Sequence, residues 1–428
     1  MTLALIACVF LVIIYLIKQD LFINFLPSIA WILFMCVPFL FSYKYFSNVR
    51  IQALGILIYL CAFFVGDFIA LKKSNRKQKV NVSTFIIPGP IIVVLATLTL
   101  SIPIIHYLIV GDIPIYHLFF DNTSLRDLQQ NRYEFNRNAT SYFFALLSNY
   151  LLMIFGPVLI MFLFAKKSFF QSLLVFIWLA LYSISSGAKL PLVFLVFVTL
   201  LIGAQSIWLS SRKSISLVIA SIFLFITLSG YLLGSLALSN ANQCPVPIGA
   251  NLTPSNILRS CNQGEEISIN PLSDTLGYRV FLTPVEVSNN WYDFFSSDLR
   301  TKNTFFDLLN RKNELKPSNI IANNYYAKYW PDSYPEFTNA NSSIDSEAFS
   351  YGGIPLVIIF SVVIVYFRYL ISLKSLPNHF AIGSLEGIGI TILTISPLSS
   401  SLPAILVPQG FWILLIVILL NRFRLLLK

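Results

Sequence analysis

The longest polar stretch of the chain runs from Ser239 to Ser350, beginning SNANQCPVPIG (239–249) and ending NSSIDSEAFS (341–350). Nowhere within it is there an apolar run of the roughly 20 residues that a bilayer-crossing helix needs. It holds 12 of the 19 acidic residues but only 8 of the 29 basic ones. The sequence on either side is strongly apolar. This stretch is therefore expected to form a water-facing domain held by membrane helices.

Composition supports a membrane protein. Of 428 residues, 56% are hydrophobic and only 11% are charged, which excludes a set of soluble domains. The net charge of +10 lies in short clusters beside apolar runs, where Lys and Arg determine membrane orientation. The lipid bilayer is thus the expected partner, and nucleic acid is not.

Orientation follows from the segment KKSNRKQK (72–79), which carries five positive charges and no acid and is expected in the cytoplasm. Counting from it gives about eleven spans. They are expected at 2–17, 21–41, 51–71, 84–110, 142–164, 169–185, 190–209, 214–238, 351–371, 380–398 and 404–420. Each loop that this count places inside carries Lys or Arg. Ten or twelve spans are the alternatives.

The expected fold is therefore an all-α polytopic membrane protein with three parts. Residues 1–238 form eight transmembrane helices with a short outer loop at 111–141. Residues 239–350 form one large, partly helical extracytoplasmic domain, and residues 351–428 add three helices and a short cytoplasmic tail.

Two of the five cysteines, Cys244 and Cys261, lie in this large outer segment. In an oxidising compartment such a pair is expected to form a disulfide that closes a loop. Two free thiols are the alternative.

Motifs of soluble enzymes do not occur in the sequence. His106, His117 and His379 are scattered, so neither a metal site nor a cofactor is expected. Inside the spans, Asp67 and Glu386 are the ionisable residues of interest, and both lie near the expected cytoplasmic ends. A coupled transporter is expected to carry charges near the middle of the bilayer, so their absence weighs against that class.

Two cations near the outer face are candidate anion ligands. Arg132 lies in SLRDLQQNRYEFNR (124–137), a segment rich in amides and aromatics that is also compatible with a solvated amphipathic helix. Lys189 ends the turn SSGAK (185–189) just before a helix start, where backbone N–H groups favour an anion. Snorkelling from a helix end is the alternative for Lys189.

The large outer segment contains three further candidates. Arg279 lies in the apolar run GYRVFLTP (277–284), either paired with a structural acid or turned toward an anionic ligand. Asn324, Tyr325 and Tyr326 combine amides with aromatic faces, as sugar recognition requires, although such residues can also simply pack the domain. Glu347, just before the ninth span, is a candidate general base or a residue that stabilises a helix N-terminus.

This layout resembles the bacterial oligosaccharide repeat-unit polymerases of the Wzy type, which extend O-antigen or capsule chains. The similarity rests on ten or more spans, a large late outer loop, the turn SGAK (186–189) and the motif EAFSYGGIP (347–355). Relatives commonly have Arg in that turn, and Lys189 keeps the charge without the bidentate fork.

The resemblance implies an inverting, metal-independent glycosyltransferase on the periplasmic face of the inner membrane. Its substrates would be oligosaccharides linked to undecaprenyl pyrophosphate, and a chain-length regulator protein would be a further partner. Arg279 and Lys189, with Arg132, would bind the pyrophosphate, and Arg279 and Glu347 would be the catalytic residues. Asn324, Tyr325 and Tyr326 would bind glycan. An O-antigen ligase and a polysaccharide flippase are the competing interpretations.

Overall fold

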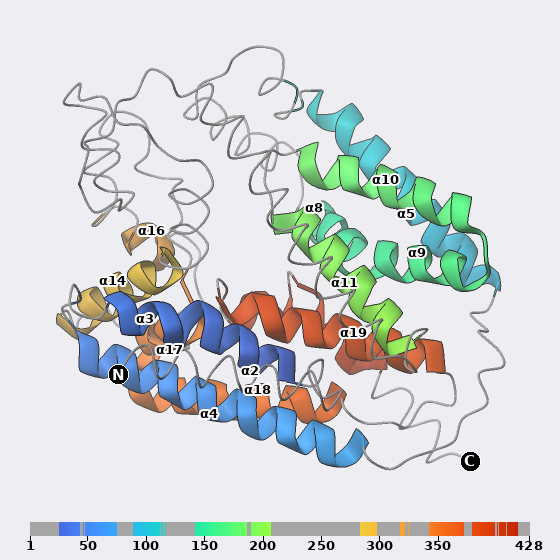
Figure 1. The fold of residues 1–428 in the computed structure, drawn as a ribbon. Helices are drawn as coiled ribbons and strands as arrows, with labels where there is room; N and C mark the ends of the chain where they lie inside the picture. Colours follow the sequence, from blue (N-terminus) through green and yellow to red (C-terminus); the bar gives the residue numbers. More distant parts are fainter. Residues whose placement is uncertain are drawn as a thin grey trace. The chain divides into compact units, whose positions relative to one another are not determined.

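The structure, a computed structural model, is helical throughout the residues it describes, among which no strand occurs (Figure 1). These residues are 25–42, 48–74, 89–111, 142–185, 190–206, 283–297, 317–321, 342–371, 379–398, 402–407 and 409–417, with 46, 113, 116, 324 and 400 between them. The prediction of an all-α chain is confirmed for this part. The expected spans 2–17 and 214–238 lie outside it.

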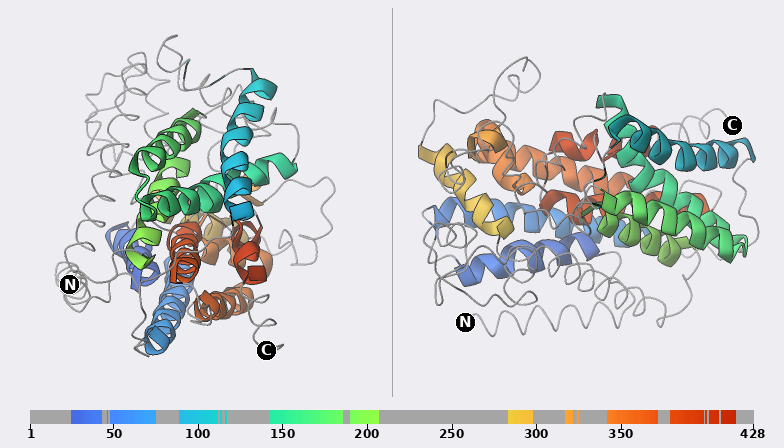
Figure 2. Two further views of the ribbon diagram at one scale, coloured as in Figure 1. Left: turned by 90° about the vertical axis from the view of Figure 1, so that its right-hand side faces the viewer. Right: turned by 90° about the horizontal axis from the view of Figure 1, so that it is seen from above.

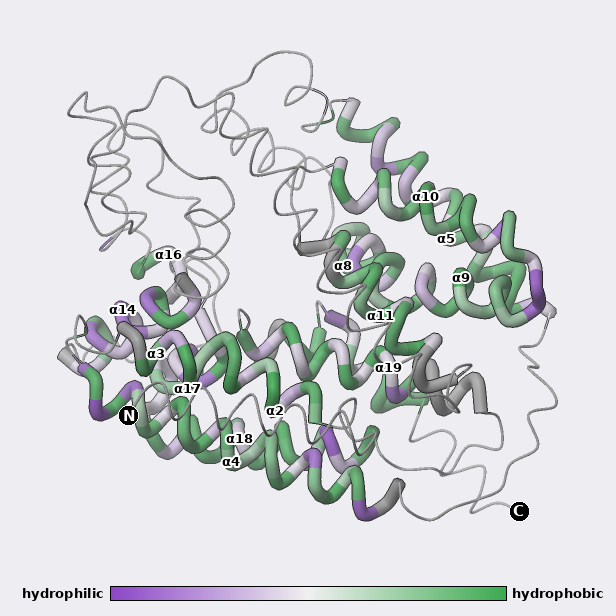
Figure 3. The backbone as a smooth tube through the Cα atoms, viewed as in Figure 1, coloured by the Kyte–Doolittle hydropathy of each residue, from purple (hydrophilic) through white to green (hydrophobic). Residues whose placement is uncertain are grey.

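Four helices are long and apolar enough to cross a membrane: Val49–Lys72, Gly89–Val110, Phe143–Ala165 and Ile354–Ile371. Shorter apolar helices cover 26–40, 169–185, 194–203 and 385–398. The hydropathy of the backbone agrees, because hydrophobic green dominates most membrane-length helices while α14 carries more hydrophilic purple (Figure 3). The prediction of a membrane protein with several helical spans is confirmed at this level.

The chain divides into two compact units. Unit 1 contains α2 (Leu26–Trp31), η2 (Ile32–Cys36), α3 (Val37–Ser42), most of α4 (Val49–Ser74), α14 (Thr283–Ser297), α16 (Pro317–Ile321), α17 (Ile344–Gly352), most of α18 (Ile354–Ile371) and η9 (Ser396–Leu398). Unit 2 contains α5 (Gly89–Val110), α8 (Tyr142–Tyr150), η4 (Leu151–Phe155), α9 (Gly156–Ala165), α10 (Phe169–Ser185), α11 (Leu190–Ser206) and most of α19 (His379–Ile395). The short α20 (Leu402–Leu406) is divided between them.

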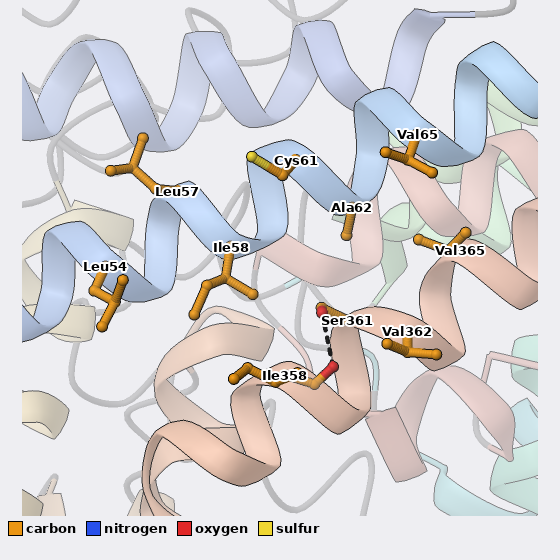
Figure 4. Close-up of a pocket in the computed structure, with 10 residues that line it drawn as sticks. All are labelled: Leu54, Leu57, Ile58, Cys61, Ala62, Val65, Ile358, Ser361, Val362 and Val365. Carbon is orange, nitrogen blue, oxygen red and sulfur yellow. Dashed lines mark hydrogen bonds between the residues drawn. The ribbon is translucent and has the colours of Figure 1, made fainter.

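In unit 1, α4 and α18 lie side by side and run in the same direction (Figures 1 and 2). Leu54 and Ile358 lie toward one end of their contact, and Val65 and Val365 lie further along both helices (Figure 4). Both helices therefore begin on the same side of the unit, which constrains how often the chain crosses the membrane between them.

An open apolar groove of about 540 Å³ follows this contact. Leu57 and Val362, which line it, are 54% and 61% exposed, as expected for side chains that face lipid. The one hydroxyl in the groove, that of Ser361, donates to the carbonyl oxygen of Ile358 at 2.7 Å (Figure 4). The Ser361 hydroxyl is therefore paired within its own helix.

Ahead of α4, the helical segment 26–42 contains a π-helical turn, η2, between two α-helical parts. Pro27 begins this segment at a position where its missing N–H costs nothing. Trp31 packs against Tyr59 and donates its indole N–H to the carbonyl oxygen of Ile56 at 3.0 Å. These contacts fix the segment on α4, while η2 packs against α14.

In unit 2, the helices α5, α9 and α10 alternate in direction in their order along the chain. α9 and α10 are antiparallel, because they are joined by a short turn at Lys166–Lys167 and Ser172 donates back to Ile160 at 2.9 Å. α10 runs parallel to α5, since Trp178 donates to the carbonyl oxygen of Thr99 at 3.1 Å and Tyr182, one turn on, contacts His106. This up-and-down order agrees with the expected fourth, fifth and sixth spans.

Candidate functional site

The motif GGIP (352–355) produces a sharp break between α17 and α18. Gly353 has a φ of 68°, a left-handed conformation that glycine adopts without strain. Its N–H donates to the carbonyl oxygen of Phe349 at 2.8 Å, and its own carbonyl oxygen accepts from Leu356 at 3.2 Å. Pro355 follows in the first turn of α18, where no N–H is needed. One residue therefore ends one helix and begins the next.

α17 packs against α14, and Asp345 is the centre of this contact. Asp345 is fully buried, and its Oδ2 accepts a hydrogen bond of 3.0 Å from the Tyr292 hydroxyl on α14. The Tyr292 ring also stacks against Phe349, with 4.8 Å between ring centroids. Tyr292 thus contacts two residues of α17 that are one helical turn apart.

The first half of α4 completes the site. Gly55 leaves room for Tyr292, since a Cβ at this position would overlap the tyrosine hydroxyl and lie 3.2 Å from Asp345 Oδ2. One turn earlier, the Gln52 side-chain amide donates to the carbonyl oxygen of Val285 at 3.0 Å. α4, α14 and α17 therefore meet through polar groups.

We call this the polar cluster, and it consists of Gln52, Tyr59, Ser288, Asn289, Tyr292 and Asp345, all buried. Five of its atoms have no hydrogen-bond partner among the described residues: Gln52 Oε1, Tyr59 Oη, Ser288 Oγ, Asn289 Oδ1 and Asp345 Oδ1. Leaving a buried polar atom unpaired costs about 1–3 kcal/mol. The cluster therefore has spare hydrogen-bonding capacity, which is unusual in a purely structural contact.

The pKa of the Asp345 carboxyl is raised above its ordinary value, mainly by burial. The Ser343 hydroxyl, Tyr292 and the backbone N–H of Ser346 oppose this rise. Its place in the first turn of α17 also favours the ionised form, by about 0.3–1 kcal/mol in exposed cases. Burying an ionised carboxylate costs roughly several kcal/mol, so burial prevails.

Glu347, the expected catalytic carboxylate, has a different environment two residues further on. It is partly exposed, and its Oε1 accepts a hydrogen bond of 2.8 Å from Tyr351. Residues two apart on a helix point about 200° apart, so when Asp345 faces the core, Glu347 faces outward. Of the two carboxylates, Glu347 is the one that a substrate can reach.

The other expected site residues are mostly outside the described part of the chain. Asn324 is described: it is exposed, and its Nδ2 donates to the carbonyl oxygen of Ile320 at 3.0 Å. Those that lie outside are Arg132, Lys189, Cys244, Cys261, Arg279, Tyr325 and Tyr326. Their expected roles stay predictions.

Sequence reasoning missed Asp345 and Tyr292 as partners. Asp345 belongs to the same motif as Glu347, but nothing in the local pattern shows which of two nearby carboxylates faces the core. Tyr292 lies 53 positions away, in the segment WYDFF (291–295). Its spacing from Trp291 and Phe295 resembles that of an ordinary core-facing helix.

Arg368 is a further ionisable residue inside a predicted span, 351–371. It lies near the end of α18, and its Nε donates to Oδ1 of Asp67 at 2.9 Å. Ser28 donates to the other oxygen of Asp67 through both its hydroxyl and its backbone N–H. Both charges are buried and compensated near the ends of α4 and α18. This geometry is that of a structural tie, because the carboxylate is fully hydrogen-bonded within the protein.

A second polar group lies in unit 2, near the end of α10 that precedes Lys189. His106 Nδ1 and the Tyr182 hydroxyl are 2.7 Å apart, and both residues are buried. The Ser185 hydroxyl donates to the carbonyl oxygen of Tyr182 at 2.6 Å. His106 is therefore tied to the C-terminal end of α10.

No protein-family model matches the chain, and neither the curated proteins nor the solved structures searched contain a match.

Proposed function

We propose that this protein is a membrane glycosyltransferase that polymerises oligosaccharide repeat units linked to undecaprenyl pyrophosphate, building O-antigen or capsular polysaccharide. It acts on the periplasmic face of a bacterial inner membrane. The observation that carries the proposal is the placement of Glu347. Its carboxylate is partly exposed on a short helix that sits directly on a membrane span and is backed by a buried polar cluster. The resemblance of the motif around it supplies the reaction class.

In the proposed reaction, Glu347 takes the proton from one hydroxyl of the acceptor sugar. The hydroxyl oxygen attacks the anomeric carbon of the donor from the side opposite the pyrophosphate. The new glycosidic bond forms as the carbon–oxygen bond to the pyrophosphate breaks, so the configuration inverts. Holding the acceptor hydroxyl and the donor carbon in line supplies much of the rate, and the leaving group needs cationic ligands.

Those ligands are the proposed roles of Arg279, Lys189 and Arg132. Arg279 lies four positions ahead of α14, the helix that carries Tyr292. An arginine there can donate two parallel hydrogen bonds to a pyrophosphate as negative charge develops. Asn324, with Tyr325 and Tyr326, is proposed to bind the glycan.

The parallel packing of α4 and α18 supports an odd number of crossings between them, as the proposed eleven spans with residues 239–350 outside the cytoplasm require. Two parallel membrane helices are separated by an odd number of crossings. Among the described helices, four apolar segments lie between them along the chain: α5, the continuous helix 142–165, α10 and α11. A fifth crossing at 214–238 would return the chain to the side on which α4 begins. The basic segment 72–79 marks the opposite side as cytoplasmic.

The test is the surface glycan of a deletion strain complemented with variants. Deletion is expected to leave single repeat units on the lipid core, and Glu347→Gln to do the same at normal protein abundance. Glu386→Gln, another partly buried carboxylate, is the matched control and should restore long chains. Bare core after deletion would mean a ligase, and unchanged glycan would exclude both activities. A chain-length regulator, if it binds, should co-purify with the active protein.

A further inference from the structure

We propose that Asp345 is a neutral carboxylic acid that acts as a positioning residue, setting the rotation of α17 and thereby the direction in which Glu347 points. This inference rests on the proposed function for its activity test, but its structural claim can be tested without it. It concerns a group that makes no contact with substrate, because Asp345 is 0% exposed.

The rotation of α17 is fixed by one tyrosine. Tyr292 donates to Asp345 at 3.0 Å and stacks on Phe349 four residues later, and positions four apart lie on the same helix face. The Tyr292 hydroxyl is itself held in the notch that Gly55 leaves in α4. A helix held at two points of one face cannot turn about its axis without breaking one of them. Glu347, about 200° around from Asp345, therefore keeps its outward direction.

The charge environment indicates that Asp345 is neutral. The titratable groups that face it are Cys36 from η2, Tyr59 from α4 and Tyr292 from α14. None of these is a cation, and in the described part of the chain no Lys or Arg pairs with Asp345. Burial also raises the pKa of the Tyr292 hydroxyl well above its usual range, so this group remains a donor. A carboxylic acid can accept that hydrogen bond through its C=O without a buried charge.

Replacing each carboxylate by its amide distinguishes the proposed roles of Asp345 and Glu347. Asparagine is neutral and keeps a C=O of the same shape, so Asp345→Asn should retain at least half of the polymerising activity. Asp345→Ala and Tyr292→Phe remove the two sides of the hydrogen bond and should each lower kcat at least tenfold. Because α17 still presents its surface, KM should change much less. Glu347→Gln should be inactive in every background.

Whether Asp345 is protonated can be measured by infrared spectroscopy of the purified full chain in nanodiscs at neutral pH. The wild-type protein is expected to show the C=O band of a protonated carboxylic acid, and Asp345→Asn should remove it. Glu347→Gln, the matched control, should leave the band unchanged. A wild-type spectrum without such a band would overturn the neutral assignment.

Orientation is read by the labelling rate of a thiol introduced by Glu347→Cys, quantified by mass spectrometry with a water-soluble maleimide. Adding Asp345→Asn should not change the rate, whereas adding Asp345→Ala or Tyr292→Phe should change it several-fold. Equal rates in all four proteins would refute the positioning role. If Asp345→Asn abolishes polymerisation while the labelling rate is unchanged, Asp345 takes part in chemistry and the inference is wrong. If deletion leaves the glycan normal, the proposed function fails, and the infrared and labelling results still decide the inference.

Discussion

Arg368 reaches across from α18 to Asp67 on α4 with 2.9 Å between Nε and Oδ1, so an opposite-charge pair is buried where two parallel spans end. Gly66 makes this approach possible, because a Cβ there would come within 3.0 Å of the Arg368 side chain. Removing either charge would leave the other uncompensated in a buried site.

The single variants Asp67→Asn and Arg368→Leu are therefore expected to destabilise the protein by about 3–5 kcal/mol. The measurement is abundance in membranes together with the thermal unfolding midpoint in detergent. Tyr366→Phe on the exposed side of α18 is the control and should change neither the abundance nor the unfolding midpoint. The double variant should be more stable than Arg368→Leu alone, and the pairing would be refuted if its effects simply added.

Gly55→Ala is expected to disrupt the polar cluster, because the added methyl would overlap the Tyr292 hydroxyl. Forcing a methyl into a packed site costs about 1–3 kcal/mol. Gly89→Ala is the matched control, since nothing lies within 4 Å of its Cβ position. Thermal unfolding of both variants decides the point, and equal midpoints would show that Tyr292 is not held in the Gly55 notch.

Asp345 should make stability depend on pH with a definite sign. Its pKa is raised in the folded protein, so the folded state binds more protons than the unfolded state above the ordinary aspartate value. Stability that is present at low pH is then lost as the pH rises through the raised value. The unfolding midpoint of the wild type, relative to Asp345→Asn, should fall as the pH rises from the ordinary aspartate value through the raised one. A difference that grows with pH would contradict the assignment.

Arg279→Ala should abolish polymerisation while the protein stays abundant and folded, if its guanidinium binds the pyrophosphate. Arg279→Lys keeps the charge and loses the fork, so it should be impaired. An arginine paired to a structural acid would behave differently, because its removal would lower abundance together with activity. The readouts are surface glycan length and protein level in the same cells.

Topology can be measured with reporter fusions along the chain. Fusions after Lys79, Lys213 and Lys374 should report the cytoplasm, and a fusion after Asn303 should report the outside. A cytoplasmic signal at Asn303 would place α14 and α17 on the side away from the proposed substrate. The parity argument from α4 and α18 would then require a different number of crossings.

The membrane helices were the most predictable part of the fold. The predicted spans 51–71, 84–110 and 351–371 correspond to α4, α5 and α18, because a long apolar run in a chain this poor in charge has few other structures available. The break at Gly353 was harder to place. The predicted ninth span began at Tyr351, whereas α17 continues to Gly352 and the membrane helix starts at Ile354.

The candidate site was only partly predictable, for a physical reason. Glu347 could be chosen from its motif, but the burial of Asp345 depends on a tyrosine 53 positions away and on a glycine in α4. The pair formed by Arg368 and Asp67 joins residues 301 positions apart, and no local pattern encodes such a contact. Hydropathy alone places Arg368 at the end of an apolar run, where it resembles an ordinary flanking cation.

Gly353 is the single residue between α17, which carries Glu347, and the apolar helix α18, so no flexible linker separates the two helices. α18 has 18 residues, or about 27 Å of helix, close to the thickness of a bilayer's hydrocarbon core. In a thicker or thinner membrane the span must tilt or shift to match. Because Gly353 has no flexible linker on either side, α17 moves with that span. In the proposed reaction, the lipid around the protein would therefore set the height of Glu347 above the membrane surface, and with it which sugar of a membrane-anchored glycan the carboxylate meets.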